Sequence, residues 1–254
     1  MSAPDRDEPF PRHPLQPPPP PNYTGRIPNT PLFVALIAFL LGGIFALGSL
    51  TFFVGGFASS GVWWATAPLG FFAAAWSFFH WGEFAVTAGW NFEKCSVDSF
   101  LLENGVTYHI AHGTAVAEYL LTLYFYPSLK SHPYIALFGI FLVVLGQALR
   151  SAAMIQAATN FSHAVAFRKR DSHVLVTDGV YAYFRHPSYA GFFYWALGTQ
   201  LVLQNPVSFV LYAGVMWRFF YRRTRAEEAA LIKFFGDQYV QYRKRVGTKM
   251  PFIA

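Results

Sequence analysis

The first stretch that could do chemistry lies in the second half of the chain and reads Arg185-His186-Pro187-Ser188-Tyr189. It places a cation, an imidazole, a hydroxyl and a phenol around one proline. Because proline disfavours helical geometry in the residue before it and is favoured in a first helical turn, we expect a helix to begin near Pro187. The amides at its start would face an anion or a polar cofactor. Taken alone, the stretch fits equally well a helix start with interfacial Arg and Tyr anchors.

A second polar group follows at Arg223 and Glu227, which share one helix face because they are four residues apart. Alone they would form a surface ion pair of little energetic value. The segment between the two groups, Tyr189 to Trp217, is uncharged but is interrupted by Asn205-Pro206. Each half would form about 23 Å of helix, which is short for a bilayer core of about 30 Å. We therefore predict two short helices in a hairpin.

The two ends of an antiparallel hairpin meet on one side of the membrane. We expect five side chains to converge there, namely His186, Ser188, Tyr189, Arg223 and Glu227. The sequence has no Gly-rich phosphate loop, nucleophile elbow or metal-binding histidine spacing, and it has a single cysteine. We therefore predict chemistry that depends on binding and charge placement, without a metal and without a covalent nucleophile.

The composition indicates which elements position these residues. The chain has 254 residues, of which 54% are hydrophobic and 13% charged, and this is too apolar for an ordinary soluble domain. We predict an all-α integral membrane protein with about six transmembrane helices, the last two being the short hairpin. The first four spans are expected within residues 31–149, at 32–58, 62–79, 110–129 and 134–149. His80, Trp81 and Glu83 would then lie where the second span leaves the membrane.

The third of these spans contains Glu118. An ionisable group at membrane depth is a candidate functional residue. The simpler alternative, which we favour, is that Glu118 pairs with a neighbouring helix.

The two ends of the chain are polar. Residues 1–30 contain an unbroken proline run from Pro17 to Pro21 and are predicted to be a disordered Pro-rich tail. From Arg218 onward, recurring aromatic residues and a basic end predict one C-terminal amphipathic helix on anionic lipid.

The positions of the basic residues predict the orientation. With a cytoplasmic N-terminus, Lys130 is the one residue among 19 Lys and Arg that falls on the far side. Both termini are therefore predicted to be cytoplasmic. The polar site is predicted to lie on the cytoplasmic face of the membrane. The net charge of +6 fits loops that face anionic lipid better than it fits nucleic-acid binding.

Several blocks in the second half occur together in a known family. They are Asn160-Phe161-Ser162-His163, Ser172 to Tyr181, Phe184 to Gly191, Trp217-Arg218-Phe219-Phe220, Glu227-Glu228, and Tyr239 to Val246. With these blocks, residues from about 145 to 254 closely resemble the isoprenylcysteine carboxyl methyltransferases. Those are membrane enzymes that methylate the C-terminal prenylcysteine of processed CaaX proteins. The block from Phe184 to Gly191 is also shared with phospholipid methyltransferases and some sterol reductases, whereas the blocks at 172–181 and 217–220 point to the narrower family.

The resemblance implies a catalytic region at residues 150–254, S-adenosylmethionine as the methyl donor, and an endoplasmic reticulum membrane location. By position, Arg223 would meet the substrate carboxylate and would be catalytic together with Glu227. The residues that would contact the cofactor are His173, Val174, Leu175, Val176, Tyr181, His186, Pro187, Ser188, Tyr189 and Glu227. One departure is the number of spans, since animal members of the family have eight.

Two other functions are compatible with the residues. A phospholipid methyltransferase of the same membrane superfamily would use a lipid amine as acceptor and would not need Arg223 as a carboxylate clamp. A non-enzymatic membrane scaffold would keep the fold without binding the cofactor.

Overall fold

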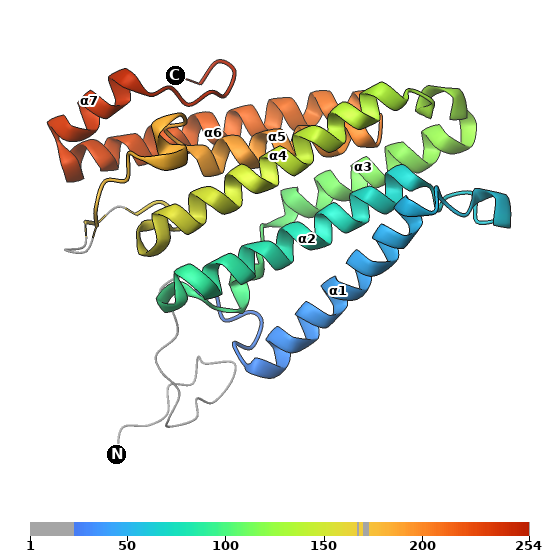
Figure 1. The fold of residues 1–254 in the computed structure, drawn as a ribbon, viewed down its shortest axis with the longest axis horizontal. Coiled ribbons are helices and arrows are strands. Elements are labelled where there is room, and N and C mark those ends of the chain that lie inside the picture. The colour runs from blue at the N-terminus through green and yellow to red at the C-terminus, as the bar shows by residue number, and fades with distance from the viewer. Residues whose placement is uncertain (1–22, 167, 170–172, 254) are drawn as a thin grey trace.

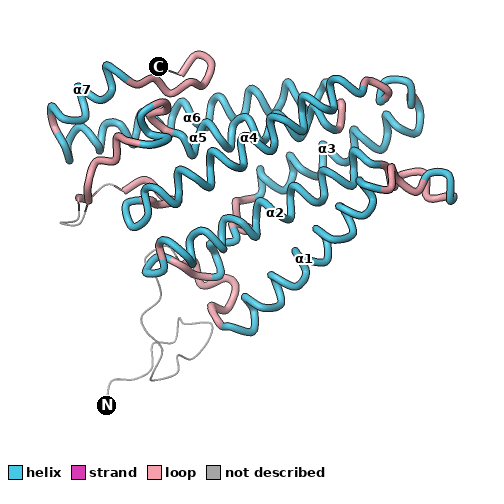
Figure 2. The backbone as a smooth tube through the Cα atoms, viewed as in Figure 1, coloured by secondary structure: helices cyan, strands magenta, loops and turns pink. Residues whose placement is uncertain are grey.

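The computed structural model describes residues 23–166, 168, 169 and 173–253, and this part of the chain folds into seven α-helices joined by short loops and single 3₁₀ turns (Figure 1). The helices are α1 (Pro31–Phe53), α2 (Ala67–Trp90), α3 (Val106–Phe125), α4 (Pro133–Ala157), α5 (Pro187–Val202), α6 (Pro206–Phe235) and α7 (Asp237–Arg245). Figure 2 shows how little of the described backbone lies outside helices. The all-α prediction is confirmed.

Helices α1 to α6 lie on the six apolar segments that the sequence predicts as spans. By length and hydropathy, two described helical segments qualify on their own as membrane-crossing, Pro31–Phe53 and Pro133–Asn160. The count of six spans therefore stays a prediction. The helix break at Asn205-Pro206 is found where expected, with Pro206 as the first residue of α6.

Three predicted boundaries are wrong. Helix α2 continues to Trp90, so Glu83 is buried inside the helix and not at its exit. Helix α6 is not short, because it runs for 30 residues through the charged region and ends at Phe235. The predicted C-terminal helix from Arg218 is divided at Gly236, which has a φ of 55°.

Residues near both ends of the described chain contact the rest of the protein. Residues 23–30, expected to belong to the disordered tail, make contacts instead: Thr24 N donates to Asp98 and Arg26 pairs with Glu103. The proline run from Pro17 to Pro21 lies outside the described residues. In α7, Tyr239 and Tyr242 are buried against the protein and do not face lipid.

Glu118 has a structural partner on a neighbouring helix. Its two carboxylate oxygens accept hydrogen bonds from the main-chain N–H groups of Val207 (2.9 Å) and Ser208 (2.6 Å), in the first turn of α6. A carboxylate at this position satisfies amides that have no partner within the helix and complements the positive dipole end. The simpler prediction for Glu118 is confirmed.

Glycines allow α4 and α5 to pack with their backbones in contact. A Cβ atom on Gly146 of α4 would lie 2.5 Å from the carbonyl oxygen of Gly191, and one on Gly191 of α5 would lie 2.8 Å from Arg150 N. Gly139 and Gly198 repeat the same contact further along the two helices. Small residues permit this approach in helix pairs. The close contact sets the α5 N-terminus beside the last turns of α4, where the polar site is built.

Candidate active site

A cavity of about 600 Å³ lies between α3, α5, α6 and the segment at 161–163. Its walls are mainly apolar and include Phe79, Phe192, Trp195, Leu211, Val215, Met216 and Phe220. One polar group on the wall is formed by Arg150, His163, Ser188, Tyr189 and Arg223. Further polar residues line the cavity elsewhere, namely Glu103, Asn104, Thr107, Tyr108, His112, Thr114, Ser162, Ser208 and Tyr212. On α6 the lining residues extend from Ser208 to Arg223, and most of those between them are apolar. Such a cavity suits a long apolar molecule with one anionic group.

Arg223 and Tyr189 meet at the polar end of the cavity, as the hairpin predicts. Arg223 Nε donates to the Tyr189 hydroxyl at 2.8 Å, and Arg223 Nη2 donates to the carbonyl oxygen of His163. The guanidinium also lies over the Tyr189 ring, with Cζ 5.2 Å from the centroid. These contacts fix the plane of the guanidinium while leaving other N–H donors for a bound anion.

The predicted convergence extends to His186 and Glu227. The His186 ring stacks on Tyr189, with centroids 5.3 Å apart, and its Nδ1 lies 3.6 Å from Glu227 Oε2. Within the described part of the chain, Glu227 Oε2 is buried without a hydrogen-bond partner. A buried oxygen of this kind favours a ligand that brings an N–H or O–H group to it.

Glu228 follows Glu227 in the chain, and its hydrogen bonds connect elements around the site. It accepts a hydrogen bond from Arg185 Nε at 2.6 Å and lies 3.2 Å from His186 Nε2. Arg185 also donates to the carbonyl oxygens of Arg243 and Val246. This network ties the start of α5 to α6 and to the C-terminal segment, and so it holds His186 in place.

The segment that leads into α5 contacts both α4 and α7 through Tyr181. The Tyr181 hydroxyl donates to the carbonyl oxygen of Ala153 in α4, while the Tyr181 carbonyl accepts from Tyr242 of α7 at 2.6 Å. Burial, together with the nearby Glu227 carboxylate, raises the pKa of Tyr181, so its hydroxyl stays protonated. The two hydrogen bonds hold Tyr181 between α4 and α7.

The other predicted cofactor residues are spread more widely. Val174 N donates to Asn160 in the 3₁₀ turn that follows α4, and the His173 ring lies 6.1 Å from that of Phe234 in α6. Leu175 and Val176 continue this extended segment. Pro187 is the first residue of α5, as predicted.

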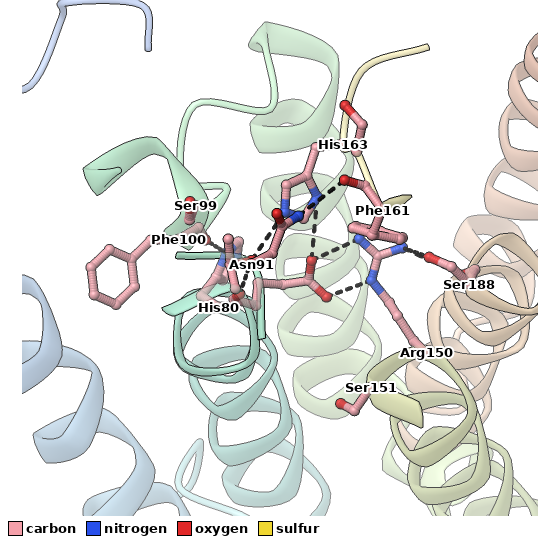
Figure 3. Close-up of polar contacts among 12 residues, drawn as sticks. His80, Asn91, Ser99, Phe100, Arg150, Ser151, Phe161, His163 and Ser188 are labelled. Carbon is pink, nitrogen blue, oxygen red and sulfur yellow. Dashed lines mark hydrogen bonds and ion pairs between the residues drawn. The ribbon is translucent and has the colours of Figure 1, made fainter. Parts of the chain in front are cut away.

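Ser188 lines the cavity, where it meets a residue that the sequence does not single out. Arg150 Nη1 donates to Ser188 Oγ at 3.0 Å, and both residues line the cavity. Arg150 is itself held by Glu83 through two hydrogen bonds, from Nε at 2.5 Å and from Nη2 at 2.8 Å. Figure 3 shows Arg150 reaching from its helix toward Ser188.

His163 links this ion pair to Arg223. Its Nδ1 lies 3.7 Å from Glu83 Oε2, and its carbonyl oxygen accepts from Arg223. Burial lowers the pKa of His163 to about 4, so the ring is neutral near pH 7 and leaves Arg150 as the cation that balances Glu83. Asn91 Nδ2 donates to the carbonyl oxygen of Phe161 at 3.0 Å and holds the segment in place (Figure 3).

Sequence patterns could have identified part of this network. Arg150 ends an apolar span and Glu83 follows another, and an ionisable residue near membrane depth is a candidate by type. Their pairing is not visible from spacing, because Glu83 and Arg150 lie on different helices, 67 residues apart.

Comparison with known proteins gives consistent matches. The model of the family described as "Isoprenylcysteine carboxyl methyltransferase (ICMT) family" matches residues 138–233. The chain is 44% identical over 220 residues to protein-S-isoprenylcysteine O-methyltransferase of Homo sapiens, covering 87% of this chain and 75% of the relative. It is 41% identical to the protein of that name from Schizosaccharomyces pombe, covering 87% and 94%. A solved structure described as the eukaryotic intramembrane Ras methyltransferase ICMT superposes with a TM-score of 0.81 at 38% identity, covering 87% of this chain and 77% of the other.

Proposed function

Because the chain belongs to the isoprenylcysteine carboxyl methyltransferase family, whose members are integral membrane enzymes, we propose that it methylates the C-terminal carboxylate of S-prenylcysteine in processed CaaX proteins. The methyl donor would be S-adenosylmethionine. The observation that carries the proposal is the cavity with Arg223 at the polar end of an apolar chamber. A prenylated cysteine has the same distribution of groups, with a carboxylate at one end and a long hydrocarbon at the other.

The acceptor needs orientation and no general base. A C-terminal carboxylate is ionised near pH 7 and is already nucleophilic. Arg223 can hold it through parallel N–H donors, and the contacts with Tyr189 and His163 keep the guanidinium from rotating. Since the carboxylate loses its charge as the ester forms, binding it too tightly would slow the reaction. The useful contribution of Arg223 is therefore the near-attack position of the carboxylate oxygen.

The residues around Glu227 are compatible with S-adenosylmethionine, the methyl donor that the family implies. S-adenosylmethionine, when bound, supplies an electrophilic methyl group. Glu227 Oε2 is a buried acceptor without a partner among the described residues, and it would take a donor N–H or O–H group. The residues proposed to hold the donor are His173, Val174, Leu175, Val176, Tyr181, His186, Pro187, Tyr189 and Glu227. Ser188, expected in this set, is better suited to the acceptor cavity because it lines that cavity and binds Arg150.

The two substrates would arrive from different solvents. Three residues that line the cavity, Ile110 of α3 and Leu211 and Phe219 of α6, are also 61%, 53% and 47% exposed. Apolar side chains exposed at the membrane face lipid. The prenyl chain would therefore enter sideways from the bilayer between α3 and α6. The polar donor would enter from the cytoplasm, with both chain termini on that side of an endoplasmic reticulum membrane.

The test is transfer of a labelled methyl group from S-adenosylmethionine to N-acetyl-S-farnesylcysteine by detergent-solubilised protein. We expect base-labile label with the natural chain and a loss of about 100-fold or more in kcat/KM for Arg223→Ala, as for removal of one partner of a hydrogen-bonded charge pair. The neighbouring Arg222 is exposed, so Arg222→Ala serves as the control and should keep the activity.

Two results would contradict the proposal. Undiminished transfer by Arg223→Ala would show that no carboxylate clamp is needed and would favour a lipid amine as the acceptor. No binding of S-adenosylmethionine by the folded protein would favour the scaffold function.

A further inference from the structure

A short segment after α4, residues 158–163, connects Arg223 to the end of α2. It leaves α4 through the 3₁₀ turn Ala158–Asn160 and reaches His163, whose carbonyl oxygen accepts a hydrogen bond from Arg223 Nη2. Residues 161–163 also line the acceptor cavity. One of the two hydrogen bonds that orient the Arg223 guanidinium therefore depends on where this backbone lies.

Two side chains that follow α2 in the chain hold this segment. Lys94 Nζ donates to the carbonyl oxygens of Thr159 and Phe161, at 2.6 Å each. Asn91 Nδ2 donates to the same Phe161 oxygen at 3.0 Å (Figure 3). The Phe161 carbonyl thus accepts from an ammonium and an amide, two residues before the carbonyl that binds Arg223.

The ring of His163 holds the segment less firmly. Its Nε2 lies 3.5 Å from Thr87 Oγ1 and its Nδ1 lies 3.7 Å from Glu83 Oε2, both longer than the roughly 2.7–3.2 Å of a normal hydrogen bond.

Lys94 supplies a stronger anchor for two physical reasons. A hydrogen bond from a charged donor is roughly twice as strong as one between neutral groups. The Lys94 ammonium also lies at the C-terminal end of α4, where a cation complements the helix dipole and the last carbonyl groups need donors. Among the contacts of the described residues, those of Lys94 therefore hold the segment most firmly.

We propose that Lys94, supported by Asn91, is a positioning residue for Arg223 and acts by fixing the backbone at residues 159–163. The inference rests on the proposed function, in which Arg223 holds the acceptor carboxylate. Lys94 does not line the cavity, so its effect on the acceptor passes through the His163 carbonyl. A displacement of about 1 Å in a reacting group can lower a rate about 100-fold, so a loosened segment has a measurable effect.

The test is kcat/KM for N-acetyl-S-farnesylcysteine in the variant Lys94→Met, which keeps a long side chain and removes the ammonium. The methyl donor is kept saturating, because Asn160 of the same segment also accepts from Val174 N in the proposed donor site. We expect a loss of about tenfold, since the carboxylate is held in a less favourable position. The loss should be smaller than for Arg223→Ala, because Asn91 still holds the segment.

Two further variants serve as rescue and control. Lys94→Arg keeps a cation with several N–H donors and should stay within about twofold of the natural chain. Lys233→Met removes an exposed lysine of α6 and should leave kcat/KM unchanged. A loss in Lys94→Arg as large as in Lys94→Met would overturn the role of the two hydrogen bonds.

Combining variants separates positioning from a general loss of structure. If Lys94 acts through Arg223, Lys94→Met should lower kcat/KM by less than about twofold in a chain that already carries Arg223→Ala, because residues that share one function are not additive. A general weakening of the fold would lower the value by the same factor in both chains. Equal losses in both, or no loss in the natural chain, would overturn the inference.

A second readout does not depend on methyl transfer. In an experimental structure of Lys94→Met, residues 159–163 should be displaced and the contact between Arg223 Nη2 and the His163 carbonyl lengthened or broken, whereas an unchanged contact would overturn the inference. If the natural chain does not methylate the prenylcysteine, the proposed function fails, while the effect of Lys94 on Arg223 is still decided by this structure.

Discussion

At the scale of single residues, the pair of Glu83 and Arg150 does more than neutralise two charges. The Glu83 side chain is 1% exposed and the Arg150 side chain 9%. Arg150 also reaches Ser188, so one ion pair connects α2, α4 and α5 beside the acceptor cavity. A buried pair contributes little net stability when intact, but removing one partner leaves an uncompensated charge.

Glu83→Gln should therefore destabilise the protein strongly. We expect a loss of about 3–5 kcal/mol in the free energy of unfolding, because Arg150 would stay charged and buried without a counter-ion. Denaturant unfolding in detergent measures it. Glu93→Gln, on an exposed loop residue, is the matched control and should change little. Equal stability of the two variants would show that Glu83 is not the counter-ion that Arg150 requires.

The residues that could be predicted from the sequence are those that local geometry brings together. His186, Tyr189, Arg223 and Glu227 converge because a hairpin must return its two ends to one side. His163 was found only as part of a motif, and its link to Glu83 depends on the packing of α2 against the end of α4. No spacing rule in the chain specifies such a contact.

At the scale of helices, the backbone contact between α4 and α5 fixes the distance between Arg150 and Ser188. A Cβ atom on Gly146 would lie 2.5 Å from Gly191 O and 2.7 Å from Trp195 N, and both are backbone atoms that cannot turn aside. Gly214 of α6 has nothing within 4 Å of the corresponding position. The two glycines therefore form a matched pair for testing the contact.

Gly146→Ala should push the two helices apart and destabilise the protein by about 1–3 kcal/mol. Methyl transfer should fall as well, because Arg150 and Ser188 separate. Gly214→Ala should be neutral or stabilising by about 0.5–1 kcal/mol, since alanine is favoured over glycine within a helix. Thermal unfolding and the methyl-transfer assay measure both effects. A Gly146→Ala protein as stable as Gly214→Ala would argue against a tight contact.

The lengths of helices were harder to predict than their order. The sequence correctly places a break at Asn205-Pro206, because proline starts helices and hinders the residue before it. It wrongly predicts a short last helix, because the apolar run stops at Trp217 and the hairpin is expected to end at Arg223. Hydropathy reports the solvent around a helix and not the course of its backbone, so α6 continues unbroken through Arg223 and Glu227.

At the scale of the whole molecule, the end of the chain closes over the segment that leads into α5. The Tyr242 hydroxyl donates to the Tyr181 carbonyl at 2.6 Å, and Arg185 N donates to the carbonyl oxygen of Gly247 at 2.9 Å. These contacts join the last residues of the described chain to those proposed to hold the methyl donor. The family resemblance predicts that these blocks belong to one catalytic region, and these hydrogen bonds connect them.

Tyr242→Phe should weaken binding of S-adenosylmethionine about 3- to 10-fold, the effect expected for one lost hydrogen bond. The KM for the prenylcysteine acceptor should stay the same, because Tyr242 does not line the acceptor cavity. Titration calorimetry of the solubilised protein measures the first value and steady-state kinetics the second. Tyr183→Phe is the control, since Tyr183 is 71% exposed. An equal loss of affinity in Tyr242→Phe and Tyr183→Phe would show that the C-terminal segment does not contribute to binding of S-adenosylmethionine.

The pairing of Glu83 with Arg150 also has a consequence for how the chain is made. Glu83 is synthesised 67 residues before its partner, which at roughly 5–20 residues per second is an interval of about 3–13 s. During that time the Glu83 carboxylate, in a mainly apolar helix, lacks the guanidinium that binds it in the folded protein. Glu83 can therefore reach its final partner only after the end of α4 has been synthesised. The ion pair thus makes the final packing of α2 depend on the later synthesis of α4.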